Sequence, residues 1–184
     1  MNSRWTRTLP LLAVVSATSF FLGCSDSESK SPDVTAGIRT SLDQAGLKDV
    51  SVSQDRLKGV VTLSGTTTSD NDKMQAEAIA KSLAGSQVVA DQIAVRPPGD
   101  ESTAKAVDAA LDDGIAKNLE AQLLLNKMNH DVSYNVKNGV VTLTGDLNSN
   151  GKRARAEKLA SSVPNVHQVV NKIEVKNMKA TSTQ

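Results

Sequence analysis

Histidine is the side chain most often used for acid–base chemistry near neutral pH, and this chain has two, His130 and His167. A histidine that acts as a general base needs a nucleophile, an acid or a metal close by. Neither histidine shares a short motif with such a group. The sequence also contains no Gly-x-Ser-x-Gly, no paired-cysteine metal site and no phosphate-binding loop. We therefore expect no enzymatic activity, metal, cofactor or small-molecule substrate; the alternative is a hydrolase with an unrecognised site.

Two acidic groups resemble cation ligands at first sight, Asp112-Asp113 and Asp70-Asn71-Asp72. Each stands where the pattern predicts the start of a helix. Acidic side chains cap the backbone N–H groups there and interact favourably with the positive end of the helix dipole. We favour capping over cation binding for both groups.

The first 23 residues have the layout of a secretory signal. Arg4 and Arg7 give a positive start, an apolar run follows from Leu9 to Leu22, and no acidic residue occurs before Asp26. The run is short for a membrane span and ends abruptly. We predict a cleaved signal peptide, residues 1–23; the alternative is an uncleaved membrane anchor.

Cys24, which follows this run, is the only cysteine of the chain, so it cannot form an internal disulfide. The segment 21–24, Phe-Leu-Gly-Cys, resembles a bacterial lipobox, in which the cysteine is lipidated and becomes the new N-terminus. In such lipoproteins a residue other than Asp after the cysteine implies export to the outer membrane, and Ser25 fits. A buried free thiol is the alternative for Cys24, but residues 25–30 are polar.

Removing the signal changes the composition of the chain. Residues 24–184 number 161, keep Tyr134 as their only aromatic residue and carry a net charge of −1 instead of +1, because Arg4 and Arg7 are lost. Sites that stack bases or sugars on aromatic rings are therefore nearly excluded. A charge so close to zero also argues against nucleic acid as a partner.

An internal repeat organises the rest of the chain. Residues 59–65, Gly-Val-Val-Thr-Leu-Ser-Gly, return as residues 139–145 with six of seven identical, an offset of 80. The same offset aligns the apolar positions that follow. Earlier in each copy, Ile38 and Leu42 match Ile115 and Leu119 at an offset of 77. We therefore expect three extra residues before the first strand of the second copy.

Each copy, here called a module, reads helix, strand, strand, helix, strand. In the first module Val34, Ile38 and Leu42 recur every four residues, as on one face of a helix. The Gly-bracketed β-branched run that follows predicts the central strand. We predict an α+β fold of two tandem αββαβ modules, each a small mixed three-stranded sheet with two helices on one face. The predicted parts are a signal peptide (1–23), a lipidated linker (24–32), module 1 (33–97), a helical linker (98–111), module 2 (112–178) and a polar tail (179–184).

The two glycine-bracketed strands, each preceded by a helix and followed by an Ala-rich helix and a short Val/Ile strand, resemble those of BON domains. Two such domains behind a lipobox are similar to tandem-BON lipoproteins of the periplasm and outer membrane. The resemblance implies binding of anionic phospholipid membranes and a role in envelope integrity or stress tolerance. It implies a structural, not a ligand-binding, role for the four glycines at the strand ends: Gly59, Gly65, Gly139 and Gly145.

Charge and periodicity place the expected membrane contact on module 2, which has a net charge of +2, whereas module 1 has −1. With Ile115 at 0° and about 100° per residue, Leu124 lies opposite, beside Lys117 and Met128. We expect this outer face to dock on anionic lipid. The expected core residues are Leu111, Leu119, Leu123 and Leu125. The expected membrane-binding residues are Lys117, Leu124, Lys127, Met128, Lys152, Arg153, Arg155 and Lys158.

Two alternatives remain open from the sequence. Leu124 could pack against module 1 or the linker helix, and the basic cluster at 152–158 could be an ordinary solvated helix face. The modules could also form an adaptor that binds an envelope protein, with the lipid serving only to localise the chain.

Overall fold

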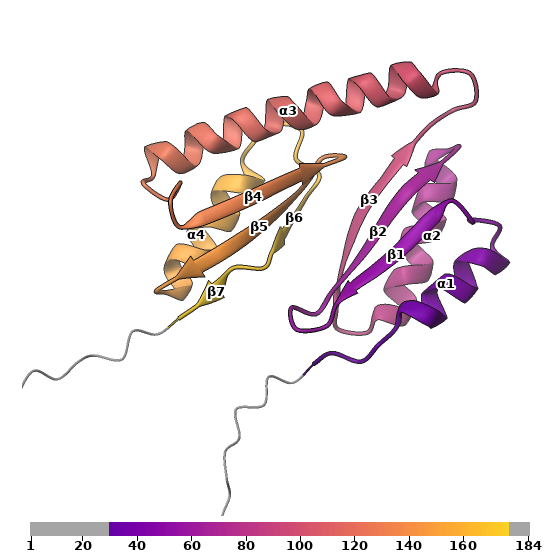
Figure 1. Ribbon diagram of the computed structural model, residues 1–184, viewed down its shortest axis with the longest axis horizontal. Coiled ribbons are helices and arrows are strands. Elements are labelled where there is room, and N and C mark those ends of the chain that lie inside the picture. Colours follow the sequence, from indigo (N-terminus) through magenta and orange to yellow (C-terminus); the bar gives the residue numbers. More distant parts are fainter. Residues whose placement is uncertain (1–29, 177–184) are drawn as a thin grey trace, which may run out of the picture.

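The computed structural model describes residues 30–176, so the predicted signal peptide, Cys24 and the whole predicted polar tail lie outside the described residues. Module 1 contains α1 (Thr35–Gln44), β1 (Val50–Asp55), β2 (Val60–Thr67), α2 (Asp70–Ala84) and β3 (Val88–Val95). β2 is central, antiparallel to β1 and parallel to β3 (Figure 1).

Module 2 repeats this topology. The second half of α3 (Glu101–Leu125) serves as its first helix, followed by β4 (Val132–Lys137), β5 (Val140–Leu147), α4 (Asn150–Ser161), β6 (Gln168–Asn171) and β7 (Glu174–Val175). β5 is antiparallel to β4 and parallel to both β6 and β7. The predicted fold class, two modules with mixed sheets, is confirmed.

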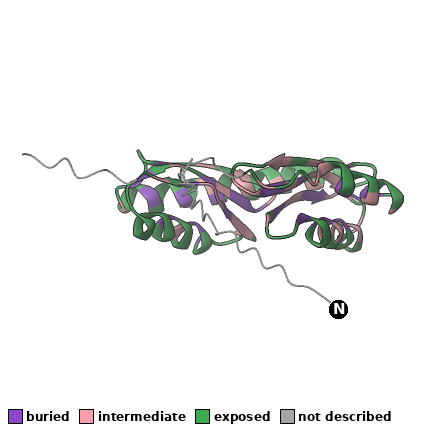
Figure 2. Cartoon of the chain, turned by 90° about the horizontal axis from the view of Figure 1, so that it is seen from below, coloured by how far each residue is buried: buried purple, intermediate pink, exposed green. Residues whose placement is uncertain are grey.

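The alternation of side chains along the central strands builds the two cores. Val61 and Leu63 of β2 are fully buried against the helices of module 1, and Val141 and Leu143 of β5 are buried in the same way in module 2. The buried residues of each module line the inner sides of its sheet and helices, whereas the outer helix surfaces are exposed (Figure 2).

The second helix of each module begins at a serine cap. Ser69 Oγ accepts from the N–H of Asp72 at 3.2 Å, and Asp70 and Asp72 lie in the first turn of α2. Ser149 Oγ accepts in the same way from the N–H of Lys152 at 3.3 Å. The prediction that Asp70 and Asp72 stand at a helix start is confirmed, but the residue that caps the backbone is Ser69, whose hydroxyl also donates to Asp72 Oδ2 at 2.8 Å.

The predicted linker helix and the first helix of module 2 are one continuous α-helix of 25 residues, α3, which runs along both modules (Figure 1). Consequently Asp112 and Asp113 lie in the interior of a helix, and the prediction that they mark a helix start is wrong. Asp112 instead accepts from the backbone N–H groups of Asn138 and Gly139, at 2.8 and 2.9 Å. It fastens α3 to the β4–β5 turn.

The two first helices correspond at an offset of 81, not the predicted 77. In module 1 the N–H groups of Gly46 and Leu47 bond to Asp43 and Leu42, and in module 2 those of Lys127 and Met128 bond to Leu124 and Leu123. Both helices therefore end in a Schellman motif, with Gly46 and Lys127 at positive φ. The sequence alignment was displaced by about one helical turn, since a shift of four residues preserves the apolar face.

The modules pack against each other along β3 and β6, which lie side by side (Figure 1). Val60 and Ala90 of module 1 form a small buried cluster with Val140 and Val170 of module 2. The side-chain amide of Gln168 donates to Val89 O at 2.7 Å and accepts from Asp91 N at 3.2 Å. A single side chain thus satisfies two backbone groups on the edge of β3.

Polar contacts flank this cluster on both sides. Lys172 lies 3.0 Å from Asp55, and Lys58 pairs with Glu174, while Asn138 donates to Gln92 O at 2.6 Å. Lys58 and Asn138 occupy equivalent positions in the repeat, and each bonds to the C-terminal strands of the other module. Because the contacts are reciprocal, the two modules are related by an approximate two-fold axis. The pKa of Asp55 is lowered: partial burial opposes ionisation, but the bonds from Lys172 and from Lys58 N–H outweigh it.

Candidate membrane-contact site

The C-terminal end of α3 presents two exposed leucines. Leu124 is 60% exposed, as expected for the outer face, and Leu125 is 77% exposed. The prediction that Leu111 and Leu125 belong to the core is wrong, since these side chains are 46% and 77% exposed. Both lie within about 80° of Ile115 around the helix, but on the side opposite to Leu119 and Leu123, which are buried. The core of module 2 takes Ile115, Leu119 and Leu123 from this helix.

The prediction that Met128 lies on the outer face is also wrong, since this side chain is only 5% exposed and belongs to the core. The helix stops at Leu125, and Lys127 adopts φ 55°, which turns the chain back over the helix end. In a Schellman motif the residue after the left-handed position contacts the residue three before the cap, here Leu123. The pair Gly46-Leu47 in module 1 carries the signal that could have predicted this.

Lys117 is exposed, but its Nζ lies 2.7 Å from Asp113 Oδ2. The hydrogen bond and the charge of Asp113 raise the pKa of this lysine, which stays protonated. Glu120 lies on the same side of α3, one turn before Leu124. The helix surface around Lys117 is therefore close to neutral, and it suits an anionic surface less well than the sequence suggested.

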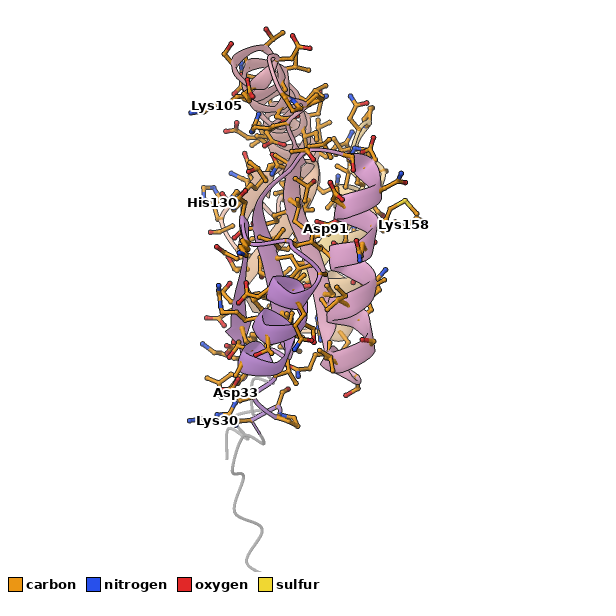
Figure 3. All side chains as sticks on the ribbon, turned by 90° about the vertical axis from the view of Figure 1, so that its right-hand side faces the viewer. Lys30, Asp33, Asp91, Lys105, His130 and Lys158 are labelled. Atoms are coloured by element: carbon orange, nitrogen blue, oxygen red, sulfur yellow. The ribbon has the colours of Figure 1, made fainter. Side chains whose placement is uncertain are left out.

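The basic cluster of α4 is exposed but divides into two sides. Arg153 reaches back toward Asn171 O at 3.4 Å, and Glu157 accepts from Asn171 Nδ2 at 2.9 Å on that same side. Arg155 points the other way and donates to Asn126 Oδ1 at 2.6 Å. Lys158 lies at the outer surface of the molecule (Figure 3).

The contact between Arg155 and Asn126 joins α4 to the end of α3. It brings together an exposed apolar tip and exposed cations that are about 30 residues apart in the sequence. We call this surface the α3–α4 patch; it consists of Leu124, Lys127, Lys152, Arg155 and Lys158. The only acid of α4, Glu157, is bonded on the opposite side, so the patch has a positive charge of four and no carboxylate of α4.

The four strand-end glycines lie at tight backbone positions. Gly65 has φ 109° and Gly145 has φ 135°, and a Cβ there would lie 2.0 Å from Asp49 O and 2.2 Å from Asp131 O. A Cβ at Gly139 would meet the ring of His167 at 2.3 Å, and one at Gly59 would lie 3.1 Å from the Ser31 side chain. Close backbone approach accounts for Gly65 and Gly145, and positive φ values of 62° and 75° account for Gly59 and Gly139.

The two histidines lie apart. His130 is exposed in the loop before β4, whereas His167 lines a cavity of about 180 Å³ between the modules, together with Lys73, Asp108 and Asp112. Within residues 30–176 no three His, Cys, Asp or Glu side chains are grouped so that they could hold a metal ion. No helix in this described range is both long and apolar enough to span a membrane.

Tandem αββαβ modules of this kind define a class of small repeat proteins, and comparison with known proteins assigns the family. The model of the BON domain matches residues 31–97 and 111–177. The chain belongs to the BON-domain family and carries two such domains in tandem.

The chain is similar to osmotically-inducible protein Y of Escherichia coli (strain K12), with 30% identity over 146 residues, covering 78% of this chain and 71% of that protein. Among solved structures it is similar to two of CdsD, a structural protein of the type III secretion system of Chlamydia trachomatis, with TM-scores of 0.34 and 0.32 and 13% and 14% identity. The matches cover 79% and 78% of this chain but only 63% and 65% of those chains, less than two thirds of their length.

Proposed function

We propose that this protein binds anionic phospholipid membrane surfaces through the α3–α4 patch, and that it supports the integrity of the cell envelope under stress. The observation that carries the proposal is the bond between Arg155 and Asn126, because it sets exposed cations beside the exposed Leu124. Shallow interfacial binding requires this combination, in which apolar side chains enter the headgroup boundary and cations meet phosphates. Each cation near an anionic leaflet contributes about 1 kcal/mol.

The second part of the proposal concerns location. The sequence features at residues 1–24 support a periplasmic protein anchored to the outer membrane by a lipid on Cys24. An acyl anchor and a basic patch together provide the two signals that stable membrane residence generally requires. The similarity to an osmotically inducible protein supports a role in envelope stress.

The first described residue, Lys30, and the α3 residue Lys105 lie at opposite ends of the view in Figure 3. The proposed anchor therefore enters module 1 far from α3, whereas the patch belongs to module 2. Because the two attachments are separate, the patch can be tested without the lipid.

The test is co-sedimentation of unlipidated residues 25–184 with vesicles, which retains both hydrophobic cores. We expect binding to vesicles of phosphatidylglycerol and phosphatidylcholine, no binding to phosphatidylcholine alone, and weakening as salt screens the cations. The variant Leu124→Glu should lose binding, whereas Leu83→Glu, at an exposed leucine of α2 in module 1, should bind like the unmodified chain. Equal binding by all three proteins would refute the site, and no binding by any would favour the adaptor function.

A further inference from the structure

Helix α3 carries a second apolar stripe in addition to its core face. Val107, Leu111 and Leu125 are 52%, 46% and 77% exposed. The stripe occupies seven positions spaced alternately three and four residues apart: Ala104, Val107, Leu111, Gly114, Asn118, Ala121 and Leu125. Six of these are exposed and Ala104 is partly buried. We call this stripe the α3 seam; it extends along about 32 Å of helix.

The spacing identifies the kind of surface that the seam fits. Alternation of three and four is the heptad pattern, which keeps one narrow stripe facing another helix. A stripe this narrow is typical of a helix–helix seam and not of the wide apolar face of a membrane-surface helix. The seam contains no charged residue, and the small side chains at Ala104, Gly114 and Ala121 allow a second helix to approach closely.

Asn118 selects the partner. It stands at the heptad position equivalent to Leu111 and Leu125, where its amide becomes buried once the seam is covered. A buried amide needs a hydrogen-bond partner, and lipid offers none in the acyl region. In a parallel, in-register pair of identical helices the amide of each Asn118 faces that of the other copy. A single polar residue of this kind specifies register and two-strandedness.

We infer that two copies of this chain associate through their α3 seams, parallel and in register. Lys117 of one copy then faces Gln122 of the other, so no like charges oppose each other across the seam. The core face of α3, centred near Leu119, lies about 110° around the helix from the seam. The core face of α3 is therefore turned away from the partner helix, and Leu111, which borders the cavity between the modules, remains 46% exposed. A parallel pair also presents both α3–α4 patches at the same end, a consequence that rests on the proposed function.

The first experiment measures the mass of residues 25–184 in solution by sedimentation velocity at micromolar to sub-millimolar concentration. We expect a concentration-dependent dimer, because one helix pair buries little surface and gives a weak interface. Ala121→Glu places a charge in the seam and should abolish the dimer. Ala109→Glu makes the same change on an exposed position of α3 outside the seam and should leave the dimer intact. A monomer at every concentration, or a dimer that survives Ala121→Glu, would overturn the inference.

The second experiment tests register and direction. Residues 25–184 contain no cysteine, so Asn118→Cys introduces the only thiol. Oxidation should cross-link this variant as a disulfide dimer, and Leu111→Cys, one heptad earlier in the seam, should also cross-link, whereas Ala109→Cys should remain monomeric. Two positions one heptad apart both meet their equivalents only in a parallel, in-register pair, so failure of either seam variant to cross-link would overturn the parallel arrangement. Val107 lies outside the α3–α4 patch; if Val107→Glu abolished vesicle binding while the chain remained monomeric, lipid would be the occupant and the inference would fail.

Discussion

Removal of the Asp112 carboxylate should destabilise the junction between α3 and the β4–β5 turn. Its two oxygens accept from the N–H groups of Asn138 and Gly139 at 2.8 and 2.9 Å in a partly buried place. Hydrogen bonds to charged groups contribute about 1.5–3 kcal/mol each, and partial exposure favours the lower values. We expect Asp112→Ala to lower the free energy of unfolding by about 2–4 kcal/mol, because both donors lose their acceptor.

The assay is thermal and urea unfolding followed by circular dichroism. For a chain of this size a loss of this magnitude corresponds to a melting temperature lower by about 4–16 °C. Asp112→Asn keeps one acceptor oxygen and should lie between the unmodified protein and Asp112→Ala. Asp113→Ala is the control, since it removes only an exposed pair with Lys117 and should have no measurable effect. If Asp112→Ala and Asp113→Ala had the same melting temperature, the two hydrogen bonds to Asp112 would make no contribution to stability.

Three further predictions concern backbone strain and burial. Gly145→Ala should cost about 3 kcal/mol or more in unfolding free energy, because the new Cβ would lie 2.2 Å from Asp131 O; Gly151→Ala, with open space around it, is the control. Lys127→Gly should stabilise the protein by about 1 kcal/mol in urea unfolding, because glycine adopts φ 55° without strain. Burial raises the pKa of Asp91 above the ordinary 3.8, so the folded state binds the carboxyl proton more tightly than the unfolded state does. The stability that this protonated carboxyl contributes is therefore complete below pH 3.8 and is lost as the pH rises through the raised pKa. Asp91→Asn should remove that dependence in pH-dependent unfolding, and an unchanged profile would show that another group titrates.

The sequence predicted the module topology because the repeat supplied two independent versions of the same pattern. The central strands 59–65 and 139–145 match almost residue for residue, so their flanking glycines and β-branched residues located both sheets. The start of α2 at Asp70 to Asp72 was accessible from the local sequence, since the chemistry of a helix start depends on residues within one turn.

The predicted membrane site was only partly accessible to sequence reasoning. The angle that placed Met128 outside assumed a helix that continues, whereas a left-handed lysine ends it one turn earlier. Leu125 was assigned to the core because helical angles do not indicate which side of the stripe the sheet occupies. The adjacency of Arg155 and Asn126 is tertiary, and no pattern within α3 or α4 contains it.

The interior position of Asp112 and the packing of the two modules were also beyond prediction. The Ala-rich segment before Asp112 indicated a helix, but nothing in it showed that this helix would join the next without a break. The contacts of Gln168 with β3 depend on module orientation, which is set by long-range contacts.

The most direct test of membrane binding through the α3–α4 patch uses a fluorescent residue at its apolar tip. Residues 25–184 contain no tryptophan, because Trp5 is the only one in the chain, so Leu124→Trp gives a single reporter outside the α3 seam. Titration with phosphatidylglycerol vesicles should shift its emission to the blue as the indole leaves water, and Leu83→Trp in module 1 should show no shift. An unshifted Leu124→Trp spectrum at saturating lipid, or equal shifts at both positions, would contradict the account.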